Sequence, residues 1–321
     1  MNKRKIAVLV FVFCIVWFPV YAAEYVNPQL LTTSADIEKN AGKWTVIDCR
    51  DDKAYAAGHI PGAISLGGPC AKVLRDPTLR IRKTEELEKF LGAAGVVREK
   101  PVALYADARL ITSASVAFWV FEYLGHEKVY FLNGGIEAWQ DAGKQLDKAE
   151  TKLPSAAYKA NVVKARLATT EEMMKIAKEQ KKDLSVIDSR TEKEHAGSDI
   201  RSLRGGRIPH TTMNVSHVRT YDVQTGKVHP MDELLKLFGG LDRNHRTIAY
   251  CQTGTRSTLT YLELRLMGFK EPANYYDSWI VSGSRLDCPV ENENWYDFVK
   301  ANDSFKDIEN LKKEVEELKK K

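Results

Sequence analysis

Short apolar runs alternate with longer amphipathic stretches along most of this chain. The amphipathic segment from Thr84 to Leu91 has helical spacing, and another begins at Thr169, where Thr-Thr-Glu-Glu fits a capping box. The apolar runs are four or five residues long and rich in β-branched residues, which is typical of buried strands; they lie at 45–48, 102–105, 128–132, 185–188 and 247–250. Buried strands that alternate with helices predict an α/β fold with a largely parallel sheet.

The order of features occurs twice. Val46-Ile-Asp-Cys-Arg50 returns as Val186-Ile-Asp-Ser-Arg190, 140 positions later, and a strand ending in Tyr comes next in each half. Each half then has a helix, a short aromatic strand and a Trp. Repetition in the same order predicts two homologous domains, at about 27–150 and 160–300, joined by a polar linker.

The N-terminus departs from this pattern. A basic stretch at residues 3–5 precedes an apolar run at 6–20, and Ala22 and Ala23 follow. This layout is typical of a secretory signal peptide, here residues 1–23. We therefore expect an exported protein, in a bacterial periplasm. The alternative is an uncleaved membrane anchor, for which an apolar run of about 15 residues is short.

The C-terminus is a charged segment at 303–321. Its apolar residues recur at a 3-4-3 spacing, which predicts an amphipathic helix; they are Ile308, Leu311, Val315 and Leu318. Such a helix either docks on the body of the protein or pairs weakly with a second chain.

Composition narrows the class of protein. With 44% hydrophobic and 28% charged residues the chain is globular, and a net charge of +5 is small for 321 residues. That charge is compatible with a small anionic substrate. The body of the chain has no basic run interleaved with aromatic residues, so the sequence does not indicate nucleic-acid binding. The histidines show no metal-ligand spacing, so we expect no metal site. Outside residues 1–23 the cysteines are too few for a disulfide scaffold; they are Cys49, Cys70, Cys251 and Cys288.

Cys251 has the local context of a reactive thiol. It follows the strand at 247–250 directly, and a glycine-containing loop and a helix come next. Ligands bind at this end of the strands in α/β sheets. Amides of the loop and the helix N-terminus stabilise an anion, and Arg256 adds positive charge, so the thiol pKa should fall. The loop residues expected to bind substrate are Gln252, Thr253, Gly254, Thr255 and Arg256. The alternative is a buried structural cysteine.

Several motifs resemble those of rhodanese sulfurtransferases. They are Cys-x-x-Gly-x-Arg-Ser at 251–257, Val-Ile-Asp-x-Arg in both halves, Gly-His-Ile-Pro-Gly-Ala at 58–63 and the aromatic segment at 129–139. The resemblance covers both halves. It implies two α/β domains, each with a five-stranded parallel sheet flanked by helices, and catalysis in the C-terminal domain only. In the N-terminal half, Ala106 or Asp107 stands where Cys251 stands in the other.

The resemblance also implies a reaction. Cys251 would take a sulfane sulfur from thiosulfate, hold it as a persulfide, and pass it to cyanide or a thiol. This reaction needs no metal and no organic cofactor. Arg190 matches a position that binds substrate anions in this family. Thiosulfate members often carry a basic residue where this chain has Thr253, so 3-mercaptopyruvate is a competing donor. A sulfur carrier that does not turn over is a further alternative. Cys-x5-Arg phosphatases have a similar loop, but Cys251 to Arg256 is one residue shorter.

Overall fold

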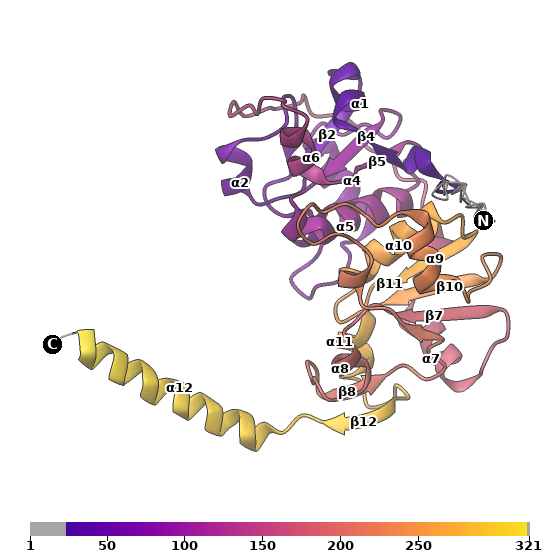
Figure 1. Ribbon diagram of the computed structural model, residues 1–321, viewed down its shortest axis with the longest axis vertical. Coiled ribbons are helices and arrows are strands. Elements are labelled where there is room, and N and C mark those ends of the chain that lie inside the picture. The colour runs from indigo at the N-terminus through magenta and orange to yellow at the C-terminus, as the bar shows by residue number, and fades with distance from the viewer. Residues whose placement is uncertain (1–23, 320–321) are drawn as a thin grey trace, which may run out of the picture.

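The computed structural model describes residues 24–319 and contains two α/β domains packed against each other, with a C-terminal helix leading away from them (Figure 1). The strand order is β1-β5-β4-β2-β3 in the N-terminal sheet and β6-β11-β10-β7-β9 in the C-terminal sheet. All strand pairs within these two sheets are parallel. The predicted fold class is confirmed. The predicted signal peptide lies outside the described residues.

The strands agree with the hydrophobic pattern. Those of the N-terminal sheet are β1 (Leu31–Thr32), β2 (Thr45–Asp48), β3 (Ile64–Ser65), β4 (Val102–Tyr105) and β5 (Val129–Leu132). Those of the C-terminal domain are β6 (Leu167–Ala168), β7 (Leu184–Asp188), β8 (Arg204–Arg207), β9 (Met213–Asn214), β10 (Arg246–Tyr250), β11 (Glu271–Tyr275) and β12 (Glu291–Trp295). Every residue of β2 and β4 is buried, because helices cover both faces of the sheet. The five strands predicted from the sequence are confirmed, to within one residue at their starts.

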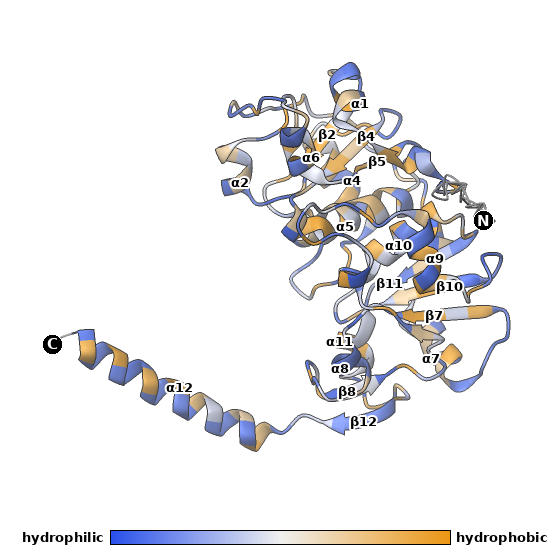
Figure 2. Cartoon of the chain, viewed as in Figure 1, coloured by the Kyte–Doolittle hydropathy of each residue, from blue (hydrophilic) through white to orange (hydrophobic). Residues whose placement is uncertain are grey.

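Helices separate most of the strands in both domains, and Figure 2 shows apolar residues in strands such as β2, β4 and β5 and a polar β12. The N-terminal domain has α1 (Ser34–Lys39), α2 (Asp52–Ala57), α3 (Cys70–Val73), α4 (Thr84–Ala93), α5 (Ile111–Tyr123) and α6 (Gly135–Asp141). The C-terminal part has α7 (Thr170–Lys178), α8 (Glu192–His195), α9 (Met231–Phe238), α10 (Arg256–Leu266), α11 (Ser278–Ser282) and α12 (Phe298–Lys319). The Thr169 side chain caps α7 by accepting a hydrogen bond from the Glu172 amide. The predicted capping box is only half formed, because the Glu172 carboxylate accepts from Arg246 at 2.7 Å.

Among the described residues, one of three buried apolar clusters is shared by the two domains, and each domain also has a cluster of its own. The shared cluster extends from the N-terminal sheet across α5 and α10 into the C-terminal domain. Within it, the hydroxyls of Ser115 on α5 and Thr258 on α10 are 2.7 Å apart. At the far end of the two helices, the Glu122 carboxylate accepts a hydrogen bond of 3.0 Å from Arg265. Because α5 and α10 each follow the central strand of their sheet, this packing brings both strand ends near the interface.

The C-terminal segment behaves differently. β12 pairs antiparallel with β8, and α12 then extends away from both domains (Figure 1). No residue of α12 is buried. The predicted tail at 303–321 falls largely within this helix, which begins five residues earlier. Within residues 24–319, none of the helices is both long enough and apolar enough to cross a membrane.

Candidate active site

Cys251 lies at the carboxyl end of the central strand β10. Its amide donates a hydrogen bond of 3.1 Å to the Ser278 hydroxyl, and its carbonyl accepts one of 3.0 Å from the Trp279 amide. These bonds attach the cysteine to α11, which follows the neighbouring strand β11. The side chain is fully buried. Its backbone is therefore fixed from two sides, and the thiol direction is set by the loop that follows.

Polar groups surround the buried thiol. The Ser257 hydroxyl lies 3.6 Å from Sγ and 2.6 Å from the Asn274 side-chain oxygen. A hydroxyl has one proton, so the two acceptors compete for it, and the sulfur gains this donor when the proton turns toward it. Hydrogen bonds from the backbone amides of Ser257 and Thr253 also lower the pKa of the thiol. Cys251 is thus buried in a polar cup and not in apolar packing.

The surroundings favour the thiolate. Burial raises the pKa of the Cys251 thiol, but the charge of Arg256 and the hydrogen bonds from Ser257 and Thr253 lower it by more. The net pKa lies below the usual value of a cysteine. Because the thiolate is the nucleophilic form, the cup prepares this sulfur for attack.

Arg256 is fixed by an acidic partner. Its guanidinium makes two hydrogen bonds to the Glu194 carboxylate, at 2.8 and 2.7 Å. Burial raises the pKa of Glu194, but this fork outweighs it and lowers that pKa to about 2. Glu194 also belongs to a capping box with Thr191 at the start of α8. The sequence shows the capping box as a Thr-x-x-Glu pattern, but not the second use of its carboxylate.

Gly254 makes the shape of the loop possible. Its φ is +72°, and a Cβ there would lie 2.2 Å from the Tyr276 carbonyl oxygen. Both facts exclude a side chain at this position. The Gly254 carbonyl accepts a hydrogen bond of 3.1 Å from the Asn274 amide group, so the loop is tied to β11 where it passes the sulfur.

The N-terminal domain contributes Arg75 to the same loop. Its guanidinium donates to the Thr253 carbonyl at 2.7 Å, to the Thr255 hydroxyl at 2.5 Å and to the Tyr276 hydroxyl. It also lies over the Tyr276 ring, 4.6 Å from its centre. Arg75 is 6% exposed, so these bonds are protected from water. Nothing in the sequence around Arg75 indicates this contact, since 176 positions separate it from Cys251.

The predicted loop residues are brought together around Cys251, but their side chains do not all face it. Thr253 and Thr255 contact Arg75, as described above. The Gln252 amide group turns away, donating to the Arg201 carbonyl at 2.9 Å and the Ser202 hydroxyl at 2.8 Å. Of the five predicted loop residues, Arg256 through its charge and Thr253 through its amide lower the pKa of the thiol.

Arg190 requires a correction. It is 1% exposed, its guanidinium pairs with Asp188 at 2.7 Å, and it donates to the Gly206 carbonyl at 2.8 Å. It also lies over the Trp279 ring at 4.5 Å, so Trp279 belongs to the core. The prediction that Arg190 binds a substrate anion does not fit a guanidinium engaged in this way.

The N-terminal domain contains an equivalent of the Arg190–Asp188 pair. Arg50 pairs with Asp48 at 2.6 Å and donates to the Gly58 carbonyl at 2.8 Å, the same arrangement in a half without the cysteine. Tyr105 donates to Asp48 just as Tyr250 donates to Asp188. The Asp-x-Arg pair is therefore a structural feature of both domains.

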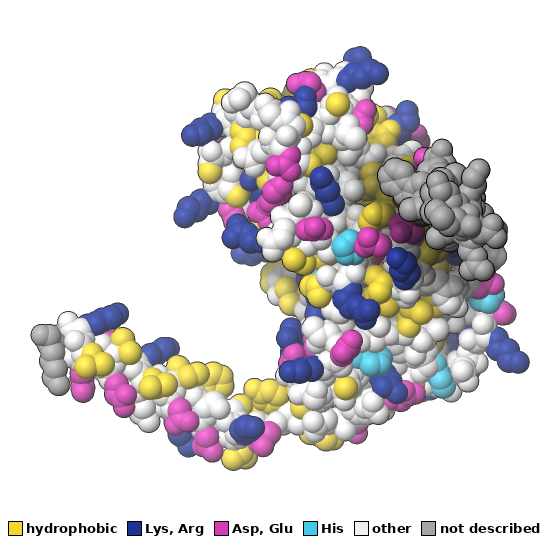
Figure 3. Space-filling view, viewed as in Figure 1, with side chains coloured by type: hydrophobic (Ala, Val, Ile, Leu, Met, Phe, Trp, Pro, Cys, Tyr) yellow, Lys and Arg dark blue, Asp and Glu magenta, His cyan; other side chains and the backbone are white. Residues whose placement is uncertain are grey.

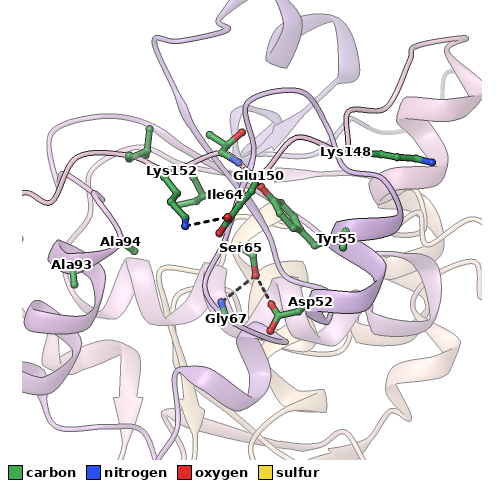
Figure 4. A pocket seen from close by; sticks show the side chains of 13 residues that line it. Asp52, Tyr55, Ile64, Ser65, Gly67, Ala93, Ala94, Lys148, Glu150 and Lys152 are labelled. Carbon is green, nitrogen blue, oxygen red and sulfur yellow. Dashed lines mark hydrogen bonds and ion pairs between the residues drawn. The ribbon is translucent and has the colours of Figure 1, made fainter.

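The largest cavity described lies elsewhere. It has a volume of about 620 Å³ and lies between α2, α4 and the linker in the N-terminal domain (Figure 4). Its polar groups already satisfy one another: the Ser65 hydroxyl bonds Asp52 at 2.9 Å, and Lys152 pairs with Glu150 at 3.1 Å. We therefore place the candidate active site at Cys251. The residues that line the cavity include no nucleophile in an activating environment.

Comparison with known proteins agrees with this architecture. A family model described as "Rhodanese-like domain" matches residues 33–142 and again residues 169–280. A Saccharopolyspora erythraea protein provisionally named a thiosulfate sulfurtransferase is 34% identical over 75% of this chain and 88% of its own length. A thiosulfate sulfurtransferase of Corynebacterium glutamicum is 29% identical over 85% of this chain and 94% of its own length.

Solved structures share the fold. An anaerobic ergothioneine biosynthesis enzyme from Chlorobium limicola superimposes with a TM-score of 0.74, over 83% of this chain and 71% of that one, at 21% sequence identity. The two matches of the family model fall one in each domain, and the second contains Cys251 and its loop. The chain therefore belongs to the rhodanese-like family and carries two rhodanese-like domains.

Proposed function

We propose that this protein is a sulfurtransferase that moves sulfane sulfur from thiosulfate to cyanide or a thiol through a persulfide on Cys251. The observation that carries the proposal is the Cys251 thiol, held in a polar cup at the end of β10 with its pKa below the usual value. Family membership and the names of the relatives support sulfur transfer in the same direction.

The first half-reaction forms the persulfide. The Cys251 thiolate attacks the outer sulfur of thiosulfate, a new S–S bond forms, and the original S–S bond breaks. Sulfite leaves with the bonding electron pair, so no external oxidant or reductant is needed. The resulting persulfide is also an anion, which the Thr253 and Ser257 amides and the Arg256 charge stabilise in the same way.

The second half-reaction regenerates the enzyme. A nucleophilic acceptor, cyanide or a thiolate, attacks the outer sulfur of the persulfide. The S–S bond breaks and its electron pair returns to Cys251 as thiolate. Covalent catalysis of this kind gives ping-pong kinetics.

Thiosulfate is favoured over 3-mercaptopyruvate by the names of the relatives and not by a side chain in the loop. The decisive experiment compares both donors with cyanide as acceptor, and records the intact mass after donor alone. The proposal expects faster turnover with thiosulfate and a mass gain of one sulfur atom that cyanide removes. Faster turnover with mercaptopyruvate would reassign the donor. A sulfur adduct without steady-state turnover would identify a carrier.

Export belongs to the same proposal. It rests on the basic and apolar stretches within residues 1–23, which precede the described residues. N-terminal sequencing of the protein recovered from its native host should find a mature chain that begins after Ala22 or Ala23. An intact N-terminus in a membrane fraction would indicate the anchor instead.

A further inference from the structure

Helix α12 carries apolar side chains that nothing in the described chain covers. It projects from the body of the molecule, and hydrophobic side chains recur along it (Figures 1 and 3). Their exposed fractions are 46% for Ile308, 58% for Leu311, 49% for Val315 and 68% for Leu318. An isolated helix of 22 residues gains little from its own hydrogen bonds in water, so packing of this face is what would stabilise it.

These residues follow a heptad repeat. Ile308 and Val315 occupy position a, and Leu311 and Leu318 occupy position d. Ala301 and Ser304 extend the same two positions by one heptad toward the body. A spacing of three and four residues places all of them along one seam, which is the pattern of a coiled coil. A seam of a and d positions alone is narrower than the core-facing stripe of a helix in a globular domain.

The residue types at the seam select the number of helices. β-Branched residues at a with leucine at d favour two parallel strands over three or four. Both a positions of the apolar heptads are β-branched, and both d positions are leucine. The seam therefore fits one partner helix with the same pattern.

The charges beside the seam select its orientation. Position g holds Asp307 and Glu314, and position e holds Phe305 in the first heptad and Lys312 and Lys319 in the next two. In a parallel pair, g of one helix faces e of the next heptad on its partner, so Asp307 meets Lys312 and Glu314 meets Lys319. In an antiparallel pair, g faces g and e faces e, which would place acid against acid and lysine against lysine. A parallel copy of α12 is the complementary partner.

We propose that α12 pairs with α12 of a second copy of this chain as a parallel two-stranded coiled coil over residues 301–319. β12 anchors the base of each helix to β8, so both bodies sit at the same end of the coil. Cys251 lies in the body, away from the seam, and each subunit keeps its own active site. Dimerisation through α12 is accordingly independent of sulfur transfer.

The first test measures the mass of the full chain by sedimentation across a dilution series. The proposal expects the mass to fall twofold on dilution, and Leu311→Asp to remain monomeric throughout. Val299→Asp is the matched control: Val299 is 75% exposed on the same helix but outside the seam, so this variant should dimerise like the parent. A parent chain that stays monomeric at every concentration overturns the proposal, as does a Leu311→Asp variant that still dimerises. Loss of dimer in both variants would also overturn it, because the seam would then not be the interface.

A second test addresses pairing and orientation. Lys312→Glu with Lys319→Glu gives a helix with acidic flanks, and Asp307→Lys with Glu314→Lys gives one with basic flanks. Each double variant alone should be monomeric, and their mixture should form a heterodimer. For orientation, Ser304→Cys should cross-link to its own copy under mild oxidation, because equivalent d positions face each other only in a parallel pair. Lys306→Cys, at the outward position f, is the control that should not cross-link. Homodimers of both charge variants, or cross-linking at 306 and not at 304, would refute the parallel coil.

Discussion

Arg75 in the N-terminal domain donates a hydrogen bond of 2.7 Å to the carbonyl oxygen of Thr253 in the C-terminal domain. A hydrogen bond from the amide of Thr253 lowers the pKa of the Cys251 thiol. One residue of the loop is therefore held by the neighbouring domain on one side and faces the nucleophile on the other. The N-terminal half has no cysteine at the matching position, yet it fixes the shape of the site.

Replacing Arg75 by Ala should lower kcat/KM roughly 10- to 100-fold, the effect of losing about 1.5–3 kcal/mol of charged hydrogen bonding on the loop. The acid limb of the kcat/KM profile should move to higher pH, because a loosened loop stabilises the thiolate less. A purely structural role would lower the melting temperature and leave the pH profile in place. Arg80→Ala is the control. Arg80 is half exposed, and its ion pair with Asp277 is long, at 3.4 Å.

Replacing Cys251 by Ser should reduce sulfur transfer by roughly 10⁴-fold or more, because the hydroxyl forms no persulfide. The polar cup accepts a hydroxyl, so the free energy of unfolding should change by about 1 kcal/mol at most. Turnover with thiosulfate and cyanide and a denaturant titration check both statements. Cys288→Ser, at another buried cysteine, should remain active. Retained activity of Cys251→Ser would end the proposed mechanism.

Arg256 and Glu194 should move the thiol pKa in opposite directions. Arg256 lowers the pKa of Cys251, so Arg256→Gln raises it and shifts the acid limb of kcat/KM to higher pH. Glu194→Gln removes the neutralising partner, so the limb shifts to lower pH. The loss in Arg256→Gln is therefore larger in acid than in alkali. Shifts of both variants in the same direction would contradict this account.

Replacing Gly254 by Ala should disrupt the loop. The left-handed φ costs about 1–3 kcal/mol with a side chain, and the clash with the Tyr276 carbonyl adds to it. We expect a lower melting temperature and loss of most sulfur transfer. Gly240→Ala is the matched control, because a Cβ there meets nothing within 4 Å. A Gly254→Ala enzyme with the parent's kcat/KM would show that the loop tolerates another shape.

Arg190→Ala should unfold more easily and bind thiosulfate as before. Removing one partner of a buried ion pair costs about 3–5 kcal/mol, and Arg50→Ala should cost a similar amount in the other domain. Denaturant titrations of both variants and the KM for thiosulfate measure this. A raised KM in Arg190→Ala with unchanged stability would restore Arg190 as an anion-binding residue.

The sequence by itself determined the fold class, the repeat and the position of the candidate nucleophile. Buried strands, helix caps and the strand–Cys251–Gly254–helix order are properties of neighbouring residues, and hydrophobic periodicity records them directly. The sequence also contained a pattern that indicates a structural role for Arg190. Asp-x-Arg occurs in both halves, including the half without the cysteine, and a substrate ligand would be needed in only one.

Only the tertiary structure decided which side chains surround Cys251. Arg75 reaches the loop from 176 positions away, and Glu194 takes hold of Arg256 from the start of another helix. The packing of α5 against α10 orients the loops, and the orientation of each loop decides which polar group its arginine contacts. Local patterning fixes where a strand ends, but the direction of a long charged side chain is set by the partners that burial brings within hydrogen-bonding distance.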